Sequence, residues 1–105
     1  MSKYIAERKL LYSLKGDDEK RELVIRIGTP YTVHQDMVDF PIGEGLIGCH
    51  IETSGLEEEY SHEAYGVDGI QALDIASNID PYLEALSNKY DLYWPTGEAY
   101  FEEEN

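Results

Sequence analysis

The residues best suited to chemistry in this chain are carboxylates interleaved with tyrosines. Glu57, Glu59 and Glu63 recur at odd positions, and Tyr60 and Tyr65 lie among them. Carboxylates form strong charge-assisted hydrogen bonds with Arg and Lys. Tyrosine adds a large contact area at a low cost in entropy. We expect these five residues to bind a basic partner. Three further carboxylates belong to the same prediction: Asp74, Asp80 and Glu84.

The distribution of charge favours the same interpretation. Residues 1–52 hold seven Lys/Arg and nine Asp/Glu, whereas residues 53–105 hold only Lys89 against thirteen Asp/Glu. The net charge of −14 exceeds the magnitude of roughly 2–8 that keeps a small domain soluble. Such a field attracts basic proteins and repels nucleic acid, anionic lipid and phosphorylated substrates. Two alternatives to partner binding remain open for the acidic residues: they can keep the chain soluble, or they can protect an exposed sheet edge.

No residue pattern predicts catalysis, a cofactor or a metal site. Ser61-His62-Glu63 has the residue types of a catalytic triad, but neighbours on a strand point to opposite faces. Cys49, the only cysteine, lies in an apolar run and is expected to be a core residue. The histidines lack the spacing of metal ligands: His34, His50 and His62. We therefore expect a protein that is not an enzyme.

The elements that must position these residues follow from hydrophobic periodicity. Alternation predicts strands over 4–14 and 22–27, joined by a polar Gly/Asp turn as a hairpin. Further strands are predicted over 46–53 and 56–65, with a short closing strand over 90–94. Residues between 31 and 45, broken by Pro and Gly, are expected to be irregular.

One helix is predicted after the fourth strand. Asp68 can cap its first turn, and Gln71 can reach back in a capping box. The helix either kinks at Pro81 or restarts there with Asp80 as its cap. Its apolar face packs on the sheet: Ala72, Ile75, Ala76, Ile79, Tyr82, Leu83 and Leu86. These elements predict an α+β fold, an antiparallel sheet of four to five strands with one main helix on one face. Residues 1–105 are expected to form a single domain, with an acidic C-terminal tail from about 98.

Three short motifs resemble a family of small uncharacterised bacterial proteins. The residues that carry the resemblance are the helix start Gly66-Val67-Asp68-Gly69-Ile70-Gln71-Ala72-Leu73, the early Ile27-Gly28-Thr29-Pro30 and the closing Leu92-Tyr93-Trp94. The resemblance implies a fold and a bacterial source, and no activity. It gives Asp68 and Gln71 the role of capping residues. The excess of Asp and Glu distinguishes this chain from that family.

Together these features predict an acidic immunity or antitoxin-like inhibitor, which neutralises a basic bacterial toxin, with a nuclease as the leading candidate. Nuclease active sites hold phosphate with cationic side chains, so a carboxylate surface can occupy them in place of substrate. Two alternatives stay open: a nucleic-acid mimic that blocks a DNA- or RNA-binding effector, and a housekeeping interaction module. The single cysteine and the lack of a leader or of a long apolar run predict a cytoplasmic protein that binds no membrane.

Overall fold

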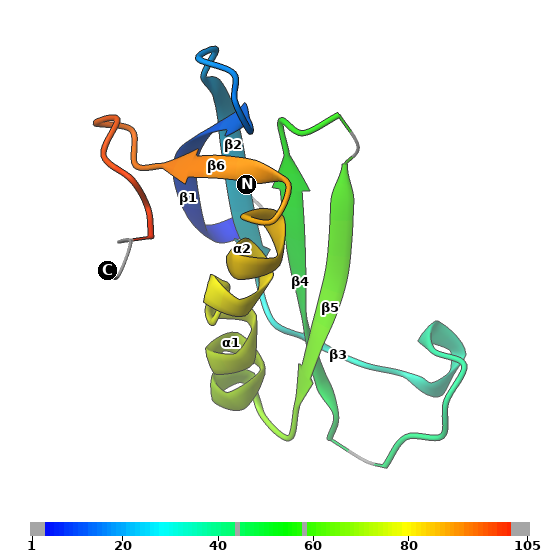
Figure 1. Ribbon diagram of the computed structural model, residues 1–105. Coiled ribbons are helices and arrows are strands. Elements are labelled where there is room, and N and C mark those ends of the chain that lie inside the picture. The colour runs from blue at the N-terminus through cyan, green and yellow to red at the C-terminus, as the bar shows by residue number, and fades with distance from the viewer. Residues whose placement is uncertain (1–3, 44, 58, 102–105) are drawn as a thin grey trace.

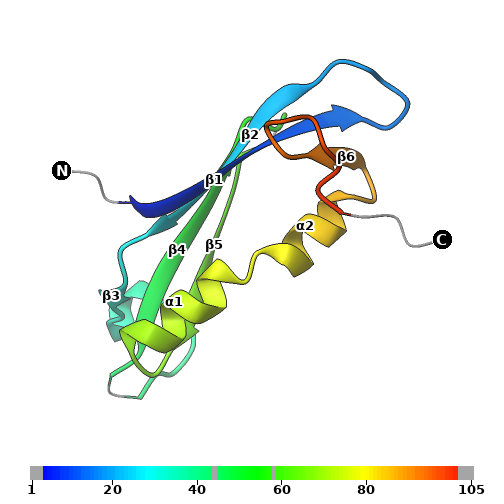
Figure 2. The same cartoon turned by 90° about the vertical axis from the view of Figure 1, so that its left-hand side faces the viewer.

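Six antiparallel strands form one sheet, and two short helices cover one of its faces (Figures 1 and 2). The computed structural model describes residues 4–43, 45–57 and 59–101. In chain order the elements are β1 (Tyr4–Leu14), β2 (Arg21–Gly28), β3 (Tyr31–Thr32), a 3₁₀ turn η1 (Gln35–Met37), β4 (Ile47–Ser54), β5 (Tyr60–Gly66), α1 (Gly69–Ser77), α2 (Asp80–Leu86) and β6 (Tyr90–Tyr93). The predicted α+β architecture is confirmed at this level.

The sheet is built around β4. β5 pairs along β4 from Ile47 to Thr53, so β2 and β3 share the opposite edge of that strand. β1 pairs with β2 as the predicted hairpin and with β6 on its other side. The outer strands of the sheet are therefore β5 at one edge and β6 at the other.

The core lies between the sheet and the helices. Alternate residues of the central strands are buried on this side, among them Leu10, Leu23, Ile25 and Ile51. Burying an aliphatic side chain of this size contributes about 1.5–3 kcal/mol each. Cys49 belongs to the same cluster and is fully buried, as predicted, and burial raises the pKa of its thiol. Neither α1 nor α2 covers the opposite side of the sheet, called the open face below (Figure 2).

The predicted cap of the helix, Asp68, is confirmed, whereas the predicted capping box is not formed. The Asp68 carboxylate accepts a hydrogen bond from the Gln71 backbone N–H at 2.8 Å. The Gln71 side chain in turn accepts from the backbone N–H of Val67 at 2.7 Å. The first bond satisfies a backbone donor that a helix start leaves without an intrahelical partner. The second ties the residue before the cap to the first turn of the helix, where a capping box would use the N–H of Asp68 itself.

The helix restarts near Pro81 instead of continuing. α1 ends at Ser77, and α2 begins at Asp80, with Pro81 in its first turn. The predicted cap is corrected, because Ile79 holds the N-cap position and no side chain caps it. Because the helix breaks there, α1 turns a different face to the sheet from the one predicted. Ile75 is 48% exposed, and Leu73 packs against the core.

Two strand predictions need correction. The sheet has six strands, because Tyr31 and Thr32 pair with Gly48 and Ile47 in the segment expected to be irregular. β5 begins at Tyr60, four residues later than predicted. The start of the predicted tail also takes part in the fold: the Tyr100 N–H donates to the Leu92 carbonyl at 2.9 Å. The last four residues of the tail, 102–105, lie outside the described residues.

Candidate functional site

The sheet divides the eight predicted partner-binding residues between its two sides. Tyr60 pairs with the buried residue Thr53, so both point to the side of the helices. Glu63 and Tyr65 occupy the alternate positions and therefore point to the open face. Glu57 and Glu59 are exposed and precede the strand. The strand residues and the helix carboxylates thus do not form one continuous surface.

The helices expose carboxylates together with apolar side chains. On α1, Ile70 and Asp74 are exposed and lie one turn apart, on the side away from the buried Ala72. On α2, Asp80 and Glu84 are also exposed and one turn apart. We call these four exposed residues the acidic helical surface. Ile70 is 83% exposed, and it lies outside the apolar face that the sequence predicts for the helix.

Most cations of the chain lie on the β1–β2 hairpin, and Arg8 reaches the acidic helical surface through Tyr100, whose hydroxyl donates to Asp80 at 2.7 Å. No Lys or Arg lies between Arg26 and Lys89. Those of the β1–β2 hairpin are engaged within their own neighbourhood: Arg26 with Glu7 at 3.4 Å, Lys15 with Asp91 at 3.2 Å and Arg21 with Glu19 at 3.3 Å. Arg8 lies over the rings of Trp94 and Tyr100 and donates to the Tyr100 hydroxyl at 2.7 Å.

Glu63 is held within the sheet by two side chains from neighbouring strands. The Tyr31 hydroxyl donates to Glu63 Oε1 at 2.6 Å, and His50 Nδ1 lies 2.5 Å from Oε2. The Tyr31 ring fits only because residue 48 is glycine, since a Cβ there would lie 2.6 Å from the ring. Both Glu63 oxygens therefore have a partner inside the fold. This cluster was missed at the level of sequence, because its members lie far apart along the chain.

The cluster makes stability depend on pH through Tyr31. Burial, and then the hydrogen bond to Glu63, raise the pKa of Tyr31 well above its ordinary value of 10.0. The folded state thus favours the protonated phenol. The stabilisation that this phenol gives the fold is fully present below pH 10 and is lost as the pH rises further. We expect the free energy of unfolding to fall above pH 10 with a slope that is steeper, by up to about 1.4 kcal/mol per pH unit, than in Tyr31→Phe. Urea titrations from pH 8 to 11 measure both slopes, and equal slopes would contradict the assignment.

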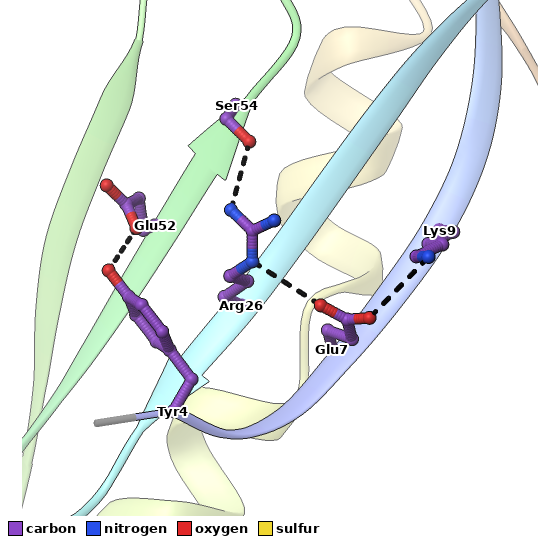
Figure 3. A network of polar contacts seen from close by, with 6 residues as sticks. All are labelled: Tyr4, Glu7, Lys9, Arg26, Glu52 and Ser54. Carbon is purple, nitrogen blue, oxygen red and sulfur yellow. Dashed lines mark hydrogen bonds and ion pairs between the residues drawn. The ribbon is translucent and has the colours of Figure 1, made fainter. Parts of the chain in front are cut away.

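A second polar network crosses the open face, and Figure 3 shows it in front of the sheet with the helices behind. Arg26 is central: its guanidinium donates to Glu7 at 3.4 Å and to the Ser54 hydroxyl at 3.4 Å. The Tyr4 hydroxyl donates to Glu52. The network mixes both signs of charge and ties β1, β2 and β4 together. It therefore has the character of a structural layer and offers no concentrated negative field.

Comparisons with known proteins add no further assignment. No known protein family, curated protein or solved structure matches this chain. The resemblance carried by the motif beginning at Gly66 stays a prediction. Among the described residues, no three His, Cys, Asp or Glu side chains gather as a metal site would require. Within the same residues, neither helix has the length and apolar content needed to cross a bilayer.

Proposed function

We propose that this chain is an acidic immunity or antitoxin-like inhibitor that binds and neutralises a basic bacterial toxin, with a nuclease as the leading candidate, in the cytoplasm. The observation that carries the proposal is the acidic helical surface, which combines carboxylates with the exposed side chain of Ile70 in a stretch without Lys or Arg. Protein interfaces use apolar anchors surrounded by polar groups, and charge complementarity speeds their formation.

A groove beside α2 supports the same proposal. It has a volume of about 630 Å³ and lies between α2, β6 and the segment that follows β6. Glu84 and Asp91 line it together with the rings of Tyr93 and Phe101. Carboxylates beside aromatic rings suit a guanidinium or ammonium group, which can form ion pairs and cation–π contacts at once. Lys15 pairs with Asp91 at this groove, and a cation of the partner would compete with it.

The proposed mechanism is occupation of the toxin's phosphate-binding cations. A nuclease gathers Lys, Arg and His to hold the nucleic-acid backbone. Asp74 and Glu84 would pair with such residues, while Ile70 fills an apolar contact near them. Glu63 is left out of this surface, because Tyr31 and His50 already hold its carboxylate.

Purification of the tagged chain from its native host tests the proposal first. We expect one basic protein to remain bound at moderate salt, and we expect the purified chain to abolish the nuclease activity of that protein at a one-to-one ratio. A partner that binds nucleic acid without cleaving it would favour the mimic instead. A chain that holds no basic protein would leave the interaction-module alternative and contradict the inhibitor.

Charge reversal on the helices tests the surface. We expect Asp74→Lys with Glu84→Lys to slow association with the partner roughly tenfold, because long-range attraction governs the rate of encounter. The matched control is Asp18→Lys with Glu22→Lys, which makes the same change of charge on exposed residues of the β1–β2 hairpin. Stopped-flow or surface-binding kinetics measure both variants. An equal slowing of the two would show that net charge matters and the helices do not.

A further inference from the structure

The two edges of the sheet differ in whether further chain pairs with the outer strand. At the β6 edge the chain folds back on itself: Ala99 bridges to Tyr93, and the Tyr100 N–H donates to the Leu92 carbonyl. At the other edge, among the described residues, β4 is the only strand paired with β5. Figure 1 shows β5 at this margin. In the stretch from Ser61 to Tyr65, every second residue therefore directs its backbone N–H and C=O away from the sheet.

Before Tyr65, β5 also lacks the features that usually protect an edge strand, whereas Tyr65 itself packs against Phe40 of the loop after η1, with ring centroids 5.7 Å apart. The strand contains no Pro or Lys, and its pairing with β4 runs from Tyr60 to Gly66 without a register shift. Its one carboxylate, Glu63, is directed onto the open face and held by His50 and Tyr31. Natural sheets normally blunt an edge with Lys, Pro or a bulge. The part of this edge that precedes Tyr65 is therefore suited to accept another strand.

We propose that β5 accepts an extended, basic segment of the partner protein as an added strand; this inference rests on the proposed inhibitor function and adds the mode of binding. Charge complementarity selects the occupant. β5 lies within the stretch that has no Lys or Arg, and the exposed Glu59 directly precedes it, whereas Glu57 lines a hollow together with Arg21. A partner strand with Lys or Arg at alternate positions gains main-chain hydrogen bonds from the edge and attraction from Glu59 and from the net negative charge of the chain.

A second copy of this chain is a poorer occupant of the same edge. Antiparallel pairing of two β5 strands about their centre would place Glu63 of one copy opposite Glu63 of the other. Like charges directly opposite each other destabilise a strand pair. Each copy also brings a net charge of −14, so the two would repel at a distance.

A synthetic peptide tests strand addition on the full chain. The probe is a blocked octapeptide of alternating Lys and Val, and its control is the same peptide N-methylated at every residue, which keeps the charge but removes the main-chain donors along both edges. We expect the first peptide to shift the amide NMR signals of Ser61–Tyr65 and to slow hydrogen exchange of the outward amides at least tenfold. We expect the methylated peptide to have neither effect. Equal effects of both peptides, or shifts confined to α1 and α2, would overturn strand addition.

Matched variants separate this inference from the proposed function. Ser61→Lys adds a positive charge at the exposed edge, and Ala85→Lys adds the same charge on exposed α2. We expect Ser61→Lys to weaken binding of the first peptide roughly tenfold, and more than Ala85→Lys does. Similar weakening by both overturns strand addition, and so does a concentration-dependent dimer that Ser61→Lys abolishes. Toxin inhibition is measured separately, so it can survive either result or fail while the peptide still binds β5.

Discussion

Gly66→Ala lowers the free energy of unfolding by about 3 kcal/mol, at the upper end of the range for overpacked sites. A Cβ at this position would lie 2.5 Å from the backbone nitrogen of Ala72 and 3.0 Å from its Cα. Both atoms belong to the first turns of α1, so no side chain can rotate away to make room. The variant has to move the helix away from β5, and this separates part of the core. Urea denaturation followed by far-UV circular dichroism measures the loss.

Gly69→Ala, three residues later, is the matched control. The added Cβ would meet only Pro30, at an ordinary contact distance of 3.8 Å. Gly69 is the first residue of α1, where alanine is the better helix former. We expect stability to be unchanged or slightly higher. If both alanine variants lose the same stability, the close approach of α1 to β5 is not what fixes residue 66 as glycine.

Leu83→Ala is expected to cost about 4 kcal/mol, within the range of roughly 2–5 kcal/mol for deleting a buried leucine side chain. Leu83 is fully buried and is the one buried residue of α2. α2 is only seven residues long and has no side-chain cap, so packing must supply its stability. Loss of Leu83 would also release Glu84, and we expect a weaker complex with the proposed basic partner.

Leu86→Ala distinguishes core packing from helix propensity. Leu86 lies on the same helix and is only partly buried, so the same change of residue type should cost about half as much. Thermal and urea unfolding of the two variants give the comparison. Equal losses would contradict the view that Leu83 anchors α2.

The regular elements of this fold were largely predictable from sequence, because they depend on local pattern. The β1–β2 hairpin follows from alternating apolar residues around a polar turn, and the start of α1 follows from Asp68 and Gln71. β3 was missed because two paired residues leave no periodicity to detect. The burial of the helices was predicted imperfectly, since the break before Asp80 changes which residues face the sheet.

The candidate site was harder to predict, because it depends on strand register. A two-residue turn at Ser54-Gly55 would have paired His50 with Glu59. The actual connection is longer, Thr53 pairs with Tyr60, and His50 therefore lies opposite Glu63. A shift in pairing moves every contact of a strand at once. The Tyr31–His50–Glu63 cluster therefore could not be predicted without the length of that connection.

The gathering of Lys and Arg on one hairpin gives the molecule a permanent electric dipole moment. An approaching cationic protein would exert a torque on it before contact and turn the hairpin away. Encounters would then begin in a narrow range of orientations, which shortens the rotational search that slows most protein associations.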